Sequence, residues 1–326
     1  MKILITGGAG FFGHHLVEHI LKTTDWDIVV LDKLTYASNG LERLRDINCF
    51  NINKVLILNG DFSKPISEGI AKEIGQVDYI VHAGAETHVD RSIENPEPFV
   101  ISNVLGTMYM LEFAKTQEHL KKFIMFSTDE VFGPAPQGTY WHEYSRYHCT
   151  NPYAASKAGA EQLCVAYKNC YKVPVTITNT MNIFGERQHS EKFIPSTINK
   201  ILKGELVTIH ADSSRAIAGT RFYIHARNVA SAIMHILNHC ENFPRINIVG
   251  EKEVDNLTLA KTIAKILGKP LDYDMVDFHS SRPGHDLRYA LDGKLLKDLG
   301  WNTPLTFEQS LESTVHWTLV NQKWLR

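Results

Sequence analysis

The first 32 residues carry the pattern that most restricts how this chain can fold. An apolar strand at 2–6 is followed by a glycine-rich loop at 7–13, a helix at 14–22 and a second strand, 27–32, that ends in Asp32. Closely spaced glycines allow a tight turn at which the backbone approaches a pyrophosphate at a helix N-terminus. An acid about 20 residues further on accepts hydrogen bonds from a ribose. The pattern therefore predicts dinucleotide binding, and it favours NAD over NADP because the acid would repel a 2′-phosphate.

Strands continue to alternate with helices as far as residue 180. The further strands expected are 55–61, 77–81, 121–126 and 173–178, and the longer helices are 98–115 and 152–171. This alternation predicts an α/β fold with a doubly wound, Rossmann-like parallel sheet. Ligands of such sheets bind beyond the carboxyl ends of the strands. We therefore look for functional residues directly after the strands.

The pattern changes after residue 180 to shorter segments punctuated by glycine and proline. We expect residues 1–180 to form the NAD-binding domain and residues 181–326 to form a smaller, mixed α/β domain that holds the substrate. The helical part of 220–240 is expected to pack back onto the first domain. Residues 261–267 and 307–320 also have the apolar spacing of helices.

The composition argues against several classes of protein and of binding partner. The formal net charge of −2 argues against a nucleic-acid-binding surface. No apolar run approaches the roughly 18 residues of a transmembrane helix, and the first residues do not form a secretory signal. Five cysteines without a Cys-x-x-Cys pair are typical of a reducing compartment, so we expect a cytoplasmic protein. The sixteen histidines show no zinc-site spacing, and no metal is expected.

A tyrosine and a lysine form the candidate catalytic base. Tyr153 and Lys157 are four residues apart, which places them on one face of the helix expected at 152–171. A lysine ammonium beside a phenol lowers the phenol pKa from its usual value of about 10. A tyrosine in that setting is usable as a base near neutral pH.

Two adjacent carboxylates follow the strand that precedes this helix. Asp129 and Glu130, in unequal environments, would provide one acid and one base; a solvated loop, or a helix cap by Asp129, is the alternative. Ser127 would orient a substrate or cap the strand end. Arg221 and Arg282 would bind a diphosphate through their guanidinium groups, or form surface or interdomain salt bridges.

Together these residues resemble a known superfamily. The Gly7-x-x-Gly10-x-x-Gly13 loop, Asp32 and the Tyr153-x-x-x-Lys157 pair are similar to those of the extended short-chain dehydrogenases/reductases. The chain more narrowly resembles the nucleoside-diphosphate-glucose 4,6-dehydratases over nearly its whole length. That match rests on five segments: LDKLTYA at 31–37, HVDRSI at 88–93, STDE at 127–130, EKFIP at 191–195 and RPGHD at 282–286. The Thr-Asp-Glu triplet discriminates, because related epimerases lack the acidic pair.

The resemblance implies a role for each catalytic residue. Tyr153, helped by Lys157, would take the proton of the sugar 4-hydroxyl while a hydride leaves C4 for NAD⁺. Glu130 would then abstract the C5 proton and Asp129 would protonate the departing 6-hydroxyl, with Thr128 hydrogen-bonded near the 4-oxygen. Return of the hydride to C6 gives the 4-keto-6-deoxy sugar and water.

The resemblance also implies which residues bind the ligands. The cofactor residues are Gly7, Gly10, Phe11, Phe12, Gly13, Asp32, Lys33, Leu34, Thr35, Asp61, Phe62, Ala83, Gly84, Ala85, Thr87, Ser102, Tyr153 and Lys157. The nucleotide-sugar residues are Thr87, Thr128, Asn182, Lys192, Phe193, Thr208, His210, Arg221, Asn247, Arg282 and His285. A homodimer built on the helices near 100–116 and 152–170 is implied as well.

Three segments depart from the family pattern. Residues 181–187 read MNIFGER rather than SNNYGPY, so that Ile183 replaces an asparagine that touches the cofactor. Thr208-Ile-His210 replaces Pro-Val-Tyr where the family packs on the base, and 213–219 resembles a small insertion. Both dTDP-glucose and UDP-glucose therefore remain candidate substrates.

Two other classes of protein stay open. A 4-epimerase or a UDP-glucuronate decarboxylase would keep Tyr153 and Lys157 but would not need Asp129 as an acid. A non-catalytic NAD-binding sensor on the same fold would usually lack the tyrosine–lysine pair.

Overall fold

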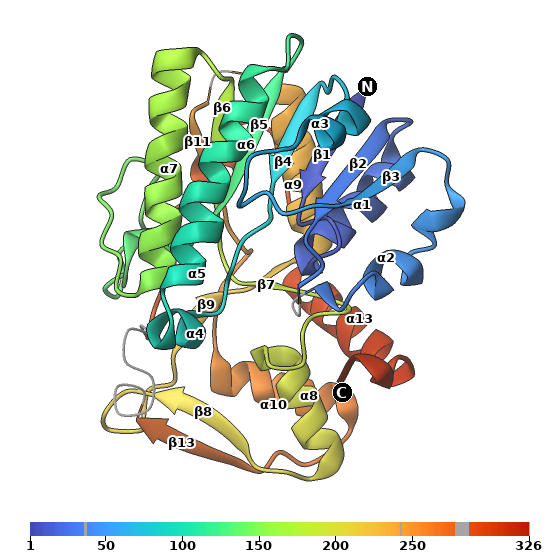
Figure 1. Ribbon diagram of the computed structural model, residues 1–326. Helices are drawn as coiled ribbons and strands as arrows, with labels where there is room; N and C mark the ends of the chain where they lie inside the picture. The colour runs from blue at the N-terminus through green and yellow to red at the C-terminus, as the bar shows by residue number, and fades with distance from the viewer. Residues whose placement is uncertain (36–37, 242, 278–286, 326) are drawn as a thin grey trace.

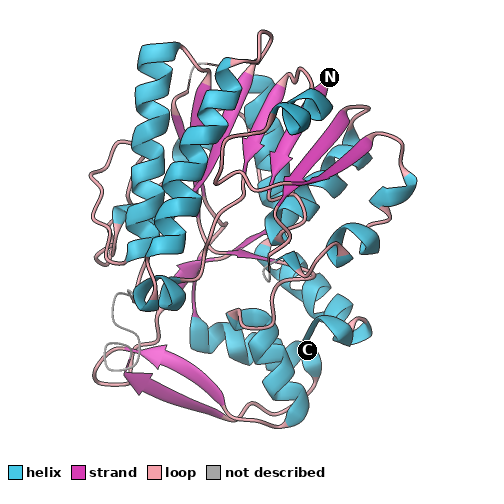
Figure 2. Ribbon diagram, in the orientation of Figure 1, coloured by secondary structure: helices cyan, strands magenta, loops and turns pink. Residues whose placement is uncertain are grey.

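A seven-stranded parallel sheet dominates the computed structural model, which describes residues 1–35, 38–241, 243–277 and 287–325 (Figures 1 and 2). The strand order is β11-β6-β5-β4-β1-β2-β3, and neighbouring strands are parallel throughout. The strands are β1 Lys2–Thr6, β2 Asp27–Asp32, β3 Val55–Asn59, β4 Tyr79–His82, β5 Lys122–Thr128, β6 Val175–Thr180 and β11 Arg245–Ile248. The predicted doubly wound sheet is thus confirmed.

Helices cover both faces of the sheet. Ile3 and Ile5 of β1 pack into one layer, whereas Leu4 packs into the other, as the two-residue period of a strand requires. The first layer is covered mainly by α1 Phe11–Thr23 and α9 Ala226–His239, and α12 Lys294–Asp298 adds to it. The second is covered by α3 Glu68–Ile74, α6 Gly106–Lys115 and α7 Pro152–Tyr171. Both β11 and α9 come from beyond residue 180.

The helix expected at 98–115 is not a uniform α-helix. It runs from α5 Glu97–Phe99 through a π-helical stretch, η3 Val100–Leu105, into α6. Within that stretch the buried Asn103 accepts a hydrogen bond from the Glu86 N–H (2.9 Å) and donates to Ser156 Oγ (2.9 Å). These hydrogen bonds connect the helix to the segment after β4 and to α7. The spacing of apolar residues in the sequence could not predict them, because they are made by a polar side chain.

The remaining elements form a smaller part below the strand ends (Figure 1). Its apolar core is shared by α8 Phe193–Lys203, α10 Asn256–Leu267 and α13 Phe307–Val320. Its strand pairs are β7 Ile183–Phe184 with β10 Ile224–His225, β8 Val207–Ala211 with β13 Tyr273–Asp277, and β9 Thr220–Phe222 with β12 Glu253–Asp255. The short helical segments of the chain are α2 Glu42–Asp46, η2 Cys49–Asn51, α4 Val89–Glu94, η4 Asp129–Phe132 and η5 Gln322–Leu325. Within the described ranges, no helix is both long and apolar enough to cross a membrane.

Candidate active site

A cavity of about 700 Å³ lies where the strand ends of the sheet meet the smaller part. Its wall includes the loops that follow β1, β2, β4 and β5, the start of α7, and residues 180–184, 188–189 and 191–194. Cavities of this size are typical of small-molecule and cofactor sites. It has the position that the parallel sheet predicts for a ligand.

The loop after β1 can be built only with glycine at two of its positions. Gly7 has φ +69°, and a Cβ there would lie 2.7 Å from Gly84 Cα. A Cβ on Gly13 would lie 2.1 Å from the Gly7 carbonyl oxygen. Phe11 and Phe12, in the first turn of α1, line the cavity, and no described side chain caps that helix. Its first backbone N–H groups therefore form an anion site suited to a pyrophosphate.

Asp32 stands at the end of β2 on the cavity wall. Its carboxylate accepts hydrogen bonds from the backbone N–H groups of Ala9 (3.0 Å) and Leu34 (2.8 Å), which ties the glycine loop to the loop after β2. Burial raises the pKa of Asp32 above its usual range, against the effect of these two hydrogen bonds. Every residue expected to hold the cofactor lines the cavity except Leu34, whose N–H is directed at Asp32.

The adjacent carboxyl groups after β5 have different surroundings. Asp129 is buried, and burial together with the charge of Glu130 raises its pKa to about 7. Its Oδ1 accepts a hydrogen bond from the Thr128 hydroxyl (3.0 Å), whereas Oδ2 has no hydrogen-bond partner among the described residues. Glu130 accepts a hydrogen bond from Asn151 Nδ2 (3.0 Å). Both carboxyl groups line the cavity, so neither is part of a solvated loop.

The tyrosine and the lysine lie together on α7, but their electrostatics differ from the expectation. Burial first, and then the charge of Glu130, raise the pKa of Tyr153, against a hydrogen bond with Thr128. Burial lowers the pKa of Lys157 to about 8, and its ammonium donates to the Phe126 carbonyl (2.7 Å). The expectation that the Tyr153 pKa lies below its usual value is therefore wrong for this structure, because burial and the charge of Glu130 raise it.

Only some of the expected substrate residues reach the cavity wall. Those that line it are Thr87, Thr128, Asn182, Lys192 and Phe193, together with Ile183 of the altered 181–187 segment. Thr208 and His210 are in β8, paired with β13, and are not on that wall. Arg282 and His285 lie outside the described residues.

Two other expected substrate residues donate hydrogen bonds to backbone carbonyl groups. Asn247, fully buried in β11, donates to the carbonyls of Trp141 (3.1 Å) and Asp292 (3.0 Å), so its amide donors do not face the cavity. Arg221 donates to the Leu287 carbonyl (2.8 Å) and does not line the cavity either. Its charge still acts on the site, because it opposes the rise in the pKa of Asp129. Contact of either residue with the nucleotide sugar, which the family resemblance implies, stays a prediction.

An ion-pair cluster at the cavity wall was not assigned from the sequence. Glu191, which precedes α8, lies 3.3 Å from Arg91 Nη2 and 3.6 Å from His88 Nε2 in α4 and its cap. His88 and Glu191 both line the cavity. The HVDRSI and EKFIP motifs contain these residues, but the motifs served only to identify the family and did not predict the ion pairs. Arg43, buried and also on the wall, had no motif that could have identified it.

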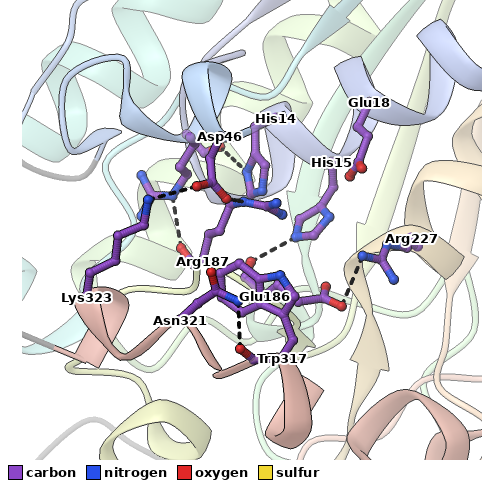
Figure 3. A network of polar contacts seen from close by, with 12 residues as sticks. His14, His15, Glu18, Asp46, Glu186, Arg187, Arg227, Trp317, Asn321 and Lys323 are labelled. Carbon is purple, nitrogen blue, oxygen red and sulfur yellow. Dashed lines mark hydrogen bonds and ion pairs between the residues drawn. The ribbon is translucent and has the colours of Figure 1, made fainter. Parts of the chain in front are cut away.

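A second polar network surrounds the residues that follow β7 (Figure 3). Arg187 has a positive φ of +65°, and its Nε donates to Asp46 Oδ2 (2.6 Å). Lys323, from the C-terminal η5, donates to the other oxygen of Asp46 (2.8 Å). The adjacent Glu186 pairs with Arg227 (3.0 Å). These contacts hold residues that follow β7 between α2, α9 and the C-terminal segment.

Comparison with known sequences matches this chain to 4,6-dehydratases of nucleotide sugars. A family model described as GDP-mannose 4,6 dehydratase matches residues 4–314. The chain is 34% identical to a dTDP-glucose 4,6-dehydratase of Escherichia coli over 99% of its own length and 95% of the relative. It is 37% identical to a trifunctional UDP-glucose 4,6-dehydratase/UDP-4-keto-6-deoxy-D-glucose 3,5-epimerase/UDP-4-keto-L-rhamnose-reductase of Arabidopsis thaliana, over 99% of this chain and 48% of that protein.

Solved structures agree in fold. DesIV, a dTDP-glucose 4,6-dehydratase of Streptomyces venezuelae solved with NAD and TYD bound, superposes with a TM-score of 0.88 at 33% identity, covering 99% of this chain and 98% of that one. A UDP-glucose 4-epimerase of Thermus thermophilus in complex with NAD gives a TM-score of 0.86 at 26% identity, over 97% and 98% of the two chains. With its sheet, its cavity and a family match that spans 4–314, this chain belongs to the GDP-mannose 4,6 dehydratase family of nucleotide-sugar enzymes.

Proposed function

We propose that this protein is an NAD-dependent 4,6-dehydratase of a nucleoside-diphosphate glucose. It converts dTDP-glucose or UDP-glucose to the 4-keto-6-deoxy sugar and water. The observation that carries the proposal is the unequal carboxyl pair after β5: a buried Asp129 whose pKa is raised to about 7, next to Glu130, in the cavity that Tyr153 also lines. A 4-epimerase has no use for such an acid.

The described residues fit NAD. The glycine loop and the first turn of α1 suit the pyrophosphate, and Asp32 suits the adenosine ribose. Held by these residues, NAD would supply a hydride acceptor for C4 of the sugar and a hydride donor for C6. Lys157 and Tyr153 line the cavity together with Ser102 and the Ala83–Ala85 segment, which the family resemblance also assigns to the cofactor.

The oxidation step needs a base at the sugar 4-hydroxyl. Tyr153 takes that proton, and Thr128, hydrogen-bonded to Tyr153, holds the 4-oxygen in line. Because burial raises the pKa of Tyr153, the phenolate needs the positive charge of Lys157 one helical turn away. The two residues therefore act together in the first step.

The elimination step needs an acid and a base of different strength. Glu130 removes the C5 proton, which the neighbouring 4-keto group has made acidic. Asp129 protonates the 6-oxygen, which leaves as water. Because its pKa is raised to about 7, about half of the Asp129 carboxyl groups carry a proton at neutral pH and can act as the general acid.

Both nucleotides are supported as substrates. The dTDP-glucose enzyme of Escherichia coli and the Arabidopsis thaliana enzyme that acts on UDP-glucose are similarly close to this chain. Incubating the purified protein separately with dTDP-glucose and UDP-glucose, and following the loss of one water by mass spectrometry, tests the function and ranks the bases. Turnover of neither substrate, with activity on epimerase or decarboxylase substrates instead, would overturn the proposal.

A homodimer and a cytoplasmic location complete the proposal. Val100 and Tyr171, at 51% and 54% exposure, and the exposed Val165 present apolar side chains on η3 and α7, the helical region implied for a dimer. Sedimentation of the wild type and of Val165→Glu tests this contact, since the variant should sediment as a monomer. The five free cysteines support a reducing compartment.

A further inference from the structure

Glu161 is a buried acid behind the active site, and neither the proposed oxidation nor the proposed elimination requires it. It lies on α7, four residues beyond Lys157, and is fully buried. Its carboxylate accepts hydrogen bonds from Ser127 Oγ, Asn179 Nδ2 (2.8 Å) and the Tyr147 hydroxyl (2.6 Å), and it pairs with Arg245 Nη1 (2.5 Å). A buried charge costs free energy unless it is paired and hydrogen-bonded, and here both conditions are met.

We propose that Glu161 is a positioning residue for the reaction, an inference that rests on the proposed function. Held by Arg245, its carboxylate fixes the end of β5 and keeps a negative charge beside Lys157.

The positioning part follows from two hydrogen bonds that meet on one oxygen. Glu161 Oε1 accepts from Ser127 Oγ and from Asn179 Nδ2. The same amide nitrogen of Asn179 donates to the Thr128 carbonyl (3.0 Å). The carboxylate is thus connected directly to Ser127 and through one side chain to Thr128, immediately before Asp129. Small displacements of reacting groups cost large factors in rate.

The electrostatic part depends on all the groups that face Lys157. On its own helix these are Glu161 and Cys164, of which Glu161 raises the pKa of Lys157 more, against the larger lowering by burial. From β4 comes His82, whose pKa is lowered to about 3, so it is neutral. Asp129 and Glu130 are on the wall of the same cavity. Without Glu161, the effect of burial on the Lys157 ammonium would be less opposed, and the pKa of Lys157 would fall further.

Competitive acetylation of Lys157 tests the charge directly. The full-length protein is labelled with trace acetic anhydride across a range of roughly pH 5.5 to 10, which brackets a lysine whose pKa lies below the usual value. The Lys157 peptide is then quantified by mass spectrometry. Glu161→Gln should lower the labelling midpoint by roughly one pH unit. Tyr147→Phe is the matched control: it removes one hydrogen bond to Glu161 but leaves its charge, so the midpoint should stay at the wild-type value.

A second variant covers the case in which Glu161→Gln folds poorly with Arg245 left unpaired. Glu161→Gln combined with Arg245→Met removes both charges, which buried pairs often tolerate, and should give the same shift. An unchanged midpoint in the folded variants, or an equal shift in Tyr147→Phe, overturns the inference. Because labelling needs no turnover, these outcomes are independent of whether the protein is a dehydratase. If it is one, kcat of Glu161→Gln should fall while KM stays within about threefold of the wild-type value.

Discussion

Two walls of the cavity differ in how their residues are held in place: one is formed by the strand ends of the sheet, and the other by residues beyond 180. On the sheet side, Asn179 of β6 donates to the Thr128 carbonyl and Glu161 of α7 accepts from Ser127, so neighbouring elements fix the end of β5. On the other side, Asn182 lies directly before β7 and Lys192 directly before α8, in the segments that flank Glu186 and Arg187 of the network in Figure 3. Groups assigned to the chemistry are therefore held by strand register, whereas groups assigned to the nucleotide sugar depend on contacts between distant segments.

Glu130→Gln should produce the largest effect, because it removes the proposed base on the sheet side. Elimination should slow by roughly 10²- to 10⁴-fold, while oxidation at C4 persists and reduced cofactor accumulates. Rapid-quench mass spectrometry and absorbance at the NADH band separate the two steps. The exposed Glu118→Gln is the matched control; rapid loss of water in Glu130→Gln would contradict the role.

Asp32→Ala should weaken NAD binding by roughly 10- to 100-fold, the loss of hydrogen bonds to a charged group. Binding of the nucleotide diphosphate should change by less than about threefold, because Asp32 is the last residue of β2 and the residues assigned to the nucleotide sugar lie mainly beyond residue 180. Isothermal calorimetry with each ligand measures both. If Asp32→Ala weakened the binding of NAD and of the nucleotide diphosphate equally, the two cavity walls would not serve different ligands.

The pH dependence of elimination should follow Asp129. Because burial and Glu130 raise its pKa to about 7, the neutral, proton-donating form is present below pH 7 and is lost as the pH rises through that value. The rate of water loss should then fall about tenfold per pH unit on the alkaline side. Asp129→Asn should abolish most of the activity, and its residual rate of water loss should no longer fall at alkaline pH. If the residual rate still falls with the same midpoint, a group other than Asp129 causes the pH dependence.

Arg187→Ala should act on the other wall and more weakly. It removes the ion pair with Asp46 that holds the loop after β7, so KM for the nucleotide sugar should rise roughly fivefold with kcat within about twofold. Lys294→Ala, which removes an exposed ion pair with Asp298, should change neither. A fall in kcat alone would show that the loop serves the chemistry.

His210→Ala should have the smallest effect. His210 lies in β8, away from the cavity wall, so the preference between dTDP-glucose and UDP-glucose should change by less than about twofold. Competition between the two substrates measures the ratio. A large change would bring β8 into the base site after all.

The sheet could be predicted from the sequence because its signals are local. The apolar run at Asp27–Asp32 and the helix at Pro152–Tyr171 have the predicted bounds. The direction of the Tyr153 pKa could not be predicted, since burial depends on what packs around α7. The Arg187–Asp46 pair joins residues that are 141 positions apart, and Asn247 is engaged by carbonyls from two other segments. Such contacts exist only once the chain is folded.

The place of β11 at the edge of the sheet has a consequence for how the molecule is made. The sheet is complete only when Arg245–Ile248 pairs with β6, and α9 covers β1 through Val229 and Ile233. A ribosome must therefore deliver the chain as far as Ile248 before this part can close, and a nascent chain that stops at 180 exposes apolar surface. Slow, long-range closure of this kind favours assistance by chaperones during synthesis.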